Sequence, residues 1–232
     1  MQRNKQETYE SFDNSPIFTV DALVRHRARA NPHAKIVSYP SSGVDFIDYS
    51  MQQLDVFAYR TARHYQTRIP TRDSSSVKPT VVALLGSSNF EYLVTIIALT
   101  KLGHTVLFLS TRISQPAMES LIETTGATFL LADAKSLNVA GSVKLSMPHL
   151  HIYEIAGGSV FDFPIDVHAD TRMDYQLDEK LETLNNIYII HSSGMCGAYL
   201  CGLFQWVTHL RLHWSAQTDI SAPSKCDCQL CV

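Results

Sequence analysis

Residues 80–109 read TVVALLGSSNFEYLVTIIALTKLGHTVLFL, and this stretch decides the fold. Its first part, Thr80–Leu85, is a continuous apolar run, which is typical of a strand buried on both faces of a parallel sheet. The apolar residues that follow recur at helical spacing and predict a helix over 89–101, which Gly103 ends. His104–Leu109 is predicted to be a second strand. Strand, helix and strand joined by short connections predict a parallel pair with a crossover helix.

The same alternation continues downstream. Ser88 and Glu91 have the spacing of a capping box at the start of the first crossover helix. Ser114 is the predicted N-cap of a third helix that ends at Gly126, and Ala127–Leu131 is predicted to be the next strand. We therefore expect an α/β fold with a doubly wound parallel sheet.

Upstream of this unit, the pattern predicts a helix, a hairpin and a second helix. Thr19 is the predicted N-cap of a helix over about 20–30. Ser50 and Gln53 form a predicted capping box for the helix after the hairpin. The expected hairpin strands are Lys35–Tyr39 and Val44–Ile47. The inward face of the second helix is predicted to carry Leu54, Phe57, Ala58, Ala62 and Tyr65.

The remaining pattern divides the chain into three parts. We expect a disordered lead-in at 1–17, a folded domain at 18–194 and an irregular C-terminal tail at 195–232. Within the domain, Ile187–His191 is predicted to be a further strand. Residues 132–186 have a weaker pattern. Their expected elements are a strand at 150–154, a loop around Gly157-Gly158 and a short helix near 177–184.

Composition excludes several classes of protein. The chain has 232 residues, of which 45% are hydrophobic and 18% charged, as in ordinary soluble globular domains. Its formal net charge of -3 gives no electrostatic reason to bind nucleic acid or an anionic membrane. No secretory signal and no apolar run of about 20 residues is present. We expect a cytoplasmic protein with neither nucleic-acid nor membrane partners.

The turn after the last predicted strand carries the main chemical signal. An apolar strand ends at His191. It is followed by the small residues Ser192, Ser193 and Gly194, of which the two serines carry hydroxyl groups. Backbone N–H groups in such a turn can approach a phosphate closely, and glycine permits the backbone angles this requires. The alternative interpretation of the Ser192-Ser193-Gly194 triplet is an ordinary turn. His191, taken alone, is better explained as a histidine at the end of a strand than as a catalytic base.

Five motifs in order along residues 18–194 resemble the adenylate-forming superfamily, which includes acyl-CoA synthetases, luciferases and non-ribosomal peptide synthetase adenylation domains. They are Phe46-Ile47-Asp48-Tyr49-Ser50; Ser87-Ser88-Asn89-Phe90-Glu91-Tyr92 after the strand; Ala98-Leu99-Thr100-Lys101-Leu102-Gly103; Leu109-Ser110-Thr111-Arg112-Ile113-Ser114; and Ile189-Ile190-His191-Ser192-Ser193-Gly194. The fourth is similar to fungal adenylate-forming reductases of the synthetase-like type. The fifth matches the opening of the family's ATP loop.

The resemblance implies ATP-dependent activation of a carboxylic acid as an acyl-adenylate, with ATP and Mg²⁺ as cofactors. In that family the acyl group passes to a thiol or a reductase, so a carrier or reductase domain is an implied partner of a full-length relative. His191, Ser192, Ser193 and Gly194 are the implied partial ATP loop. No catalytic residue and no metal ligand is assigned by the resemblance in this chain.

The chain departs from the family after Gly194, where it reads Met-Cys-Gly-Ala-Tyr-Leu-Cys-Gly. The loop lysine and all later family motifs are missing. We therefore expect a truncated adenylation domain that does not bind ATP productively and performs no catalysis. A non-enzymatic nucleotide-binding or interaction module is the alternative. A dinucleotide-binding dehydrogenase is disfavoured because no Gly-x-Gly-x-x-Gly follows a strand.

The C-terminal tail has an unusual composition. All five cysteines and both tryptophans lie between Cys196 and Cys231. Cys226-x-Cys228-x-x-Cys231 could ligate Zn²⁺, although no second pair with finger-like spacing exists. The apolar stretch Tyr199–Trp214 could contact a membrane, but His209, Arg211 and His213 interrupt it. The third interpretation, which we favour, is that the residues after the interrupted motif are not evolved protein but result from a frameshift, a retained intron or a gene-model error.

Overall fold

The computed structural model describes residues 17, 19–41, 44–70, 72, 78–166, 177–178, 182–192 and 199–205. The helices are α1 (Val20–Ala30), α2 (Met51–Gln66), α3 (Phe90–Lys101), α4 (Gln115–Thr125), α5 (Leu137–Ser146) and α6 (Gly158–Phe161). The strands are β1 (Lys35–Pro40), β2 (Phe46–Ser50), β3 (Val81–Leu85), β4 (Thr105–Leu109), β5 (Phe129–Ala132), β6 (His151–Glu154), β7 (Asn186–Ser192) and β8 (Tyr199–Gln205).

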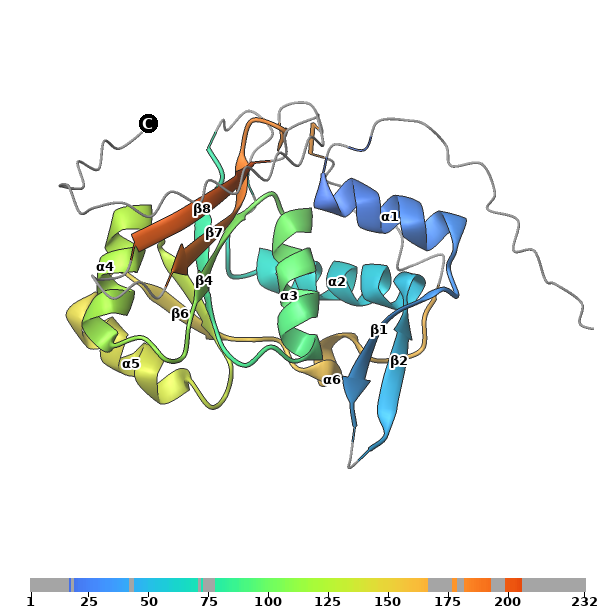
Figure 1. Cartoon of the computed structure of the whole chain (residues 1–232), viewed down its shortest axis with the longest axis horizontal. Coiled ribbons are helices and arrows are strands. Elements are labelled where there is room, and N and C mark those ends of the chain that lie inside the picture. Colours follow the sequence, from blue (N-terminus) through green and yellow to red (C-terminus); the bar gives the residue numbers. More distant parts are fainter. Residues whose placement is uncertain are drawn as a thin grey trace, which may run out of the picture.

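The central sheet has the strand order β6-β5-β3-β4-β7-β8 (Figure 1). The first five strands in that order run parallel, and β8 pairs antiparallel with β7. β3 is flanked by β4, which it reaches through α3, and by β5, which follows β4 through α4. The predicted α/β class with a doubly wound parallel sheet is therefore confirmed.

Alternating side chains of the strands fill two cores on opposite faces of the sheet. Ala83, Leu107 and Leu130 pack with residues of α4 and α5 on one face. Val82 and Leu131 pack with residues of α2 and α3 on the other. Since all of these strand residues are almost fully buried, the continuous apolar runs in the sequence reflect helices on both faces.

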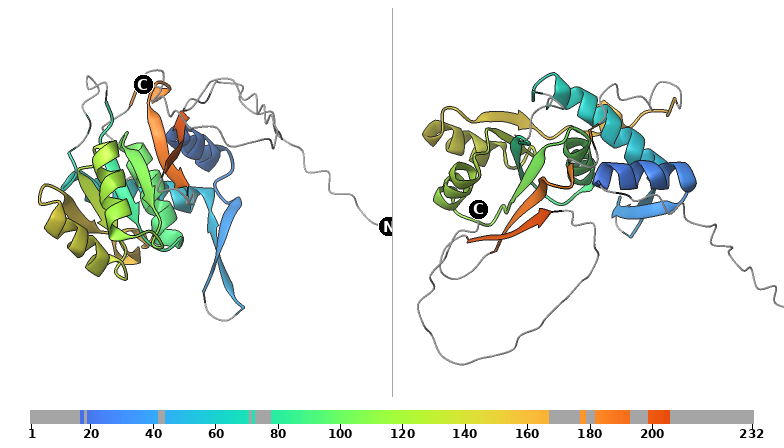
Figure 2. Two further views of the ribbon diagram at one scale, coloured as in Figure 1. Left: turned by 60° about the vertical axis from the view of Figure 1, so that its left-hand side comes forward. Right: turned by 90° about the horizontal axis from the view of Figure 1, so that it is seen from above.

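An aromatic cluster attaches the β1–β2 hairpin to the helices. The hairpin projects from the body of the molecule (Figure 2). At its base the rings of Tyr49 and Phe90 are stacked with their centroids 3.5 Å apart, and Phe57 contacts both rings edge-on. The predicted hairpin is present, with strands that begin and end a few residues from their expected bounds.

The N-terminus of each helix shows whether the predicted capping residue is correct. Thr19 and Ser50 cap α1 and α2 as predicted, and Ser50 forms the full capping box with Gln53. The predicted Ser88–Glu91 capping box is wrong. Asn89 is the N-cap of α3, because its side-chain oxygen accepts a hydrogen bond from the Tyr92 backbone N–H.

The weakly patterned region contains a helix that the sequence pattern did not predict. α5 buries only Ala140 and Val143, and it contains Gly141, so its amphipathic signal is faint. The Gly157-Gly158 loop leads directly into the short α6. Of the short helix expected near 177–184, the structure describes one helical hydrogen bond, from the Glu182 N–H to the Asp178 carbonyl.

Both chain ends lie largely outside the described residues. The residues that are not described include Ser193 and Gly194, the candidate zinc cysteines after residue 225, and the expected lead-in up to residue 16. Within the tail expected to be irregular, the structure describes β8, whose pairing with β7 joins Leu200 to His191.

Candidate functional site

The carboxyl ends of the parallel strands β3, β4, β5 and β7 meet at one edge of the sheet. β7 lies beside β4 with Leu107 opposite Ile189, so the ends of these two strands are neighbours. Ligands of open α/β sheets bind outside this edge, where turns and helix N-termini present backbone N–H groups. We call this region the carboxyl edge; its residues are Gly86, Ser87, Ser110, Asp133, His191 and Ser192.

His191 is held at the carboxyl edge by the turn after β4. The Ser110 backbone N–H donates to His191 Nε2 at 3.2 Å. Because Nε2 accepts this bond, a neutral imidazole carries its proton on Nδ1. Nδ1 is buried and has no hydrogen-bond partner among the residues that the structure describes. The ring therefore fixes the end of β7 against β4, which is the role of a strand-end histidine.

The turn after β4 is itself closed by a side chain. The Ser110 hydroxyl accepts a hydrogen bond from the Arg112 N–H at 3.2 Å. This contact orients the Ser110 N–H group, which donates the hydrogen bond to His191 Nε2. The predicted loop thus begins at a fixed point: His191 and Ser192 are the last residues of β7, whereas Ser193 and Gly194 lie outside the described residues.

Asp133, which follows β5, is a residue of the carboxyl edge that sequence reasoning missed. Its Oδ2 accepts from the Ser87 N–H and its Oδ1 from the Ser136 N–H, both at 2.8 Å. Partial burial raises the pKa of the Asp133 carboxyl, but the hydrogen bonds from Ser136 and Ser87 outweigh it and hold the pKa below its usual value. An aspartate directly after an apolar strand was the available signal.

Gly86 permits the close approach of the β3 turn to Asp133. A Cβ at this position would lie 3.1 Å from both Cβ and Cγ of Asp133. The β3 connection leads to α3 on one face and the β5 connection to α5 on the other. The Gly86–Asp133 contact therefore marks the topological switch point of the sheet, where such folds place their ligands.

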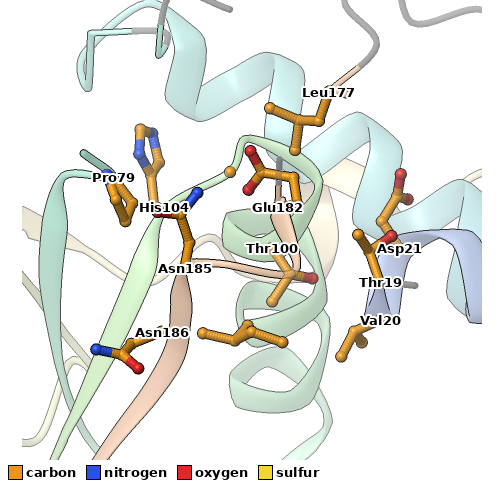
Figure 3. A pocket seen from close by; sticks show the side chains of 12 residues that line it. Thr19, Val20, Asp21, Pro79, Thr100, His104, Leu177, Glu182, Asn185 and Asn186 are labelled. Atoms are coloured by element: carbon orange, nitrogen blue, oxygen red, sulfur yellow. The ribbon is translucent and has the colours of Figure 1, made fainter. Parts of the chain in front are cut away.

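A pocket at the opposite, amino edge of the sheet has a different character (Figure 3). Thr19, Asp21, Thr100, His104, Glu182 and Asn185 are among the residues that line it. Glu182 is bound to Arg72, whose Nη1 lies 2.9 Å from Glu182 Oε2. Asp21 accepts from Lys101 Nζ at 2.7 Å. Since both carboxylates already have cationic partners, this pocket offers a ligand little charge.

Two kinds of feature are absent from the residues that the structure describes. No three His, Cys, Asp or Glu side chains in this part of the chain are grouped as metal ligands would be. Among the helices described, none combines the length and apolar character needed to cross a bilayer.

No protein-family model and no curated protein matches the sequence. Solved structures do match. A Mycobacterium tuberculosis fatty acyl CoA synthetase is 18% identical with a TM-score of 0.55 over 76% of this chain and 33% of that protein. O-succinylbenzoate coenzyme A synthetase from Bacillus subtilis, in complex with AMP, is 17% identical with a TM-score of 0.51 over 75% and 39%.

The adenylation domain of a keto acid-selecting non-ribosomal peptide synthetase module, bound to keto acyl adenylate, is 13% identical with a TM-score of 0.56 over 78% of this chain and 31% of that one. The chain thus spans about a third of the length of these proteins. At these identities the likeness establishes the fold: the α/β fold of the N-terminal domain of adenylate-forming acyl-CoA synthetases and adenylation domains.

Proposed function

We propose that this chain is the N-terminal part of a carboxylate-adenylating domain and supplies the opening of its ATP loop. The observation that carries the proposal is the position of His191. The Ser110 N–H fixes it at the carboxyl edge of the sheet, immediately before Ser192, Ser193 and Gly194. The fold shared with synthetases solved with AMP or an acyl adenylate supports the same assignment.

The residues present are suited to one part of phosphate binding, the donation of backbone N–H groups. Small residues after β7 allow backbone N–H groups to approach a phosphate. Bound ATP would supply the adenylyl group that a substrate carboxylate takes up at the α-phosphate, with pyrophosphate leaving. The chain's own contribution is to orient this loop, since positioning and backbone donors dominate such reactions.

Charge neutralisation is the part that this chain does not supply. In the family pattern that Ser193-Gly194 opens, Gly197 takes the place of the second glycine, but Leu200 stands at the lysine position. We therefore propose that the chain does not itself form acyl-adenylates. The fungal reductase subtype and the carrier or reductase partners are proposals from the resemblance, and a cytoplasmic location is a proposal from the sequence composition.

Calorimetric titration with Mg-ATP tests the proposal. We expect no heat of binding in the micromolar range for the chain, and a measurable affinity for the triple variant Met195→Thr, Cys196→Thr, Leu200→Lys, which restores the loop chemistry. Adding His191→Leu to that variant should abolish the gain, whereas exposed His149→Leu should not.

Two results would count against the proposal. Micromolar binding by the unchanged chain, without acyl-hydroxamate formation from any carboxylic acid, would favour the nucleotide-binding module. Acyl-hydroxamate formation above background by the unchanged chain would overturn the statement that it is not catalytic.

A further inference from the structure

An apolar groove lies between α1, the start of β1 and the first residue of α2. Its volume is about 350 Å³, and it is lined by Leu23, Arg27, Asn31, Ala34, Ile36 and Met51. Ile36 is 50% exposed although it is a large aliphatic residue. The groove is therefore a surface that an apolar partner could cover at a gain in free energy.

The surface around the groove is basic. Residues 17–36 contain three arginines and one lysine but a single acidic residue, Asp21. Asp21 accepts from Arg25 at 3.0 Å, and Asp48 on β2 binds Lys35. Arg27 lines the groove, and exposed Arg29 lies two residues further along α1. Charge complementarity thus favours an occupant that combines apolar and acidic side chains.

The segment just before α1 has this chemistry. Residues 7–13 read Glu-Thr-Tyr-Glu-Ser-Phe-Asp, with acidic residues at every third position and aromatic residues at Tyr9 and Phe12. Such spacing places like side chains on one face of a helical turn. The segment lies outside the described residues.

The connection is long enough for this segment to fold back. Phe12 lies seven positions before the N-cap Thr19, and an extended chain of that length spans roughly 23 Å. The groove follows α1 from Leu23 to Asn31, which is about 12 Å of helix. Phe12 can therefore reach any point of the groove while Thr19 keeps its place.

We propose that residues 7–13 of this chain occupy the groove, with Tyr9 and Phe12 against Ile36 and Met51. The carboxylates of Glu10 and Asp13 then lie near the basic side chains of α1. A flat bilayer would fit this concave surface poorly. A second copy of the chain is the main competing occupant, and the following experiment distinguishes it.

Photo-crosslinking of the full chain tests the proposal directly. With Phe12→p-benzoylphenylalanine, irradiation should link residue 12 to the peptide that contains Ile36 or Met51 of the same chain. The yield should not change on tenfold dilution. Gln2→p-benzoylphenylalanine, ten residues away, is the control and should label that peptide weakly. Links between two chains with a yield that rises with concentration, or links to other surfaces only, overturn the proposal.

Hydrogen exchange gives a second, independent readout. Docking should slow exchange of the amides of residues 7–13 about tenfold relative to the Ile36→Ser variant. Val44→Ser, at an 89% exposed position of the same hairpin outside the groove, is the matched control and should leave the protection unchanged. Arg27→Glu should remove protection, and adding Glu10→Arg should restore part of it. Unprotected amides in the unchanged chain overturn the proposal.

Discussion

The two edges of the sheet are held together in different ways. At the amino edge, buried charges connect distant elements: Lys101, with a 3% exposed side chain, binds Asp21 on α1 and Asp55 on α2. At the carboxyl edge, turns are ordered by hydrogen bonds that involve backbone N–H groups, such as those made by Ser110 and Asp133. The difference indicates that the amino edge is more sensitive than the carboxyl edge to the loss of one partner.

The largest effect should come from removing the cation of the amino edge. Lys101→Met leaves the carboxylates of Asp21 and Asp55 partly buried without their shared partner. We expect the free energy of unfolding to fall by about 3 kcal/mol, the lower end for a broken buried pair. Urea unfolding measures it. Lys135→Met, at an exposed position, should change stability by less than about 0.5 kcal/mol.

Acid should weaken the amino edge through His104. Burial, followed by the nearby Arg72 charge, lowers the pKa of His104 to about 4. Because this folded-state pKa lies below the unfolded value of about 6.5, the unfolded chain binds more protons between the two. Stability is full above that range and falls as pH decreases, by about 2 kcal/mol between pH 7 and 5.

The His104→Gln variant should lose most of that pH dependence in urea unfolding, while exposed His149→Gln should keep it. An unchanged profile in His104→Gln would show that other groups dominate acid sensitivity.

At the carboxyl edge, a methyl group should have a smaller effect. Gly86→Ala places a Cβ 3.1 Å from Asp133 Cβ and Cγ, and we expect it to destabilise the fold by about 1 kcal/mol. Gly141→Ala in α5, where a Cβ meets nothing within 4 Å, should instead stabilise by up to about 1 kcal/mol. Thermal unfolding of the Gly86→Ala and Gly141→Ala variants tests whether stability falls in the first and rises in the second. If both variants are destabilised, the argument from the close approach of Gly86 to Asp133 is contradicted.

The smallest effect is expected for Asp133→Asn. The hydrogen bonds that lower its pKa stabilise the fold above the ordinary aspartate pKa, and this contribution is lost as pH falls through the lower folded value. Because the carboxylate is only partly buried, we expect a loss below about 1 kcal/mol at pH 7. Asp45→Asn on the exposed hairpin is the control and should be neutral.

Local sequence signals predicted most of the fold but little of either edge. The β3–α3–β4 unit was predictable because apolar runs, glycine stops and short connections agree. α5 was missed because Gly141 and only two buried residues weaken its periodicity. The Lys101–Asp21 pair joins residues 80 positions apart, and no local pattern encodes such a contact. The strand that ends near His191 was predictable from its apolar residues, whereas the Ser110 partner of His191 depends on which strand lies beside β7.

The position of β7 next to β4 also has a consequence for the order of folding. The Ser110–His191 contact closes a separation of 81 residues, and the Arg72–Glu182 contact closes one of 110. Contacts that close long loops cost more chain entropy than those within β3–α3–β4 and form later. We therefore expect β7 to be the last parallel strand to join the sheet.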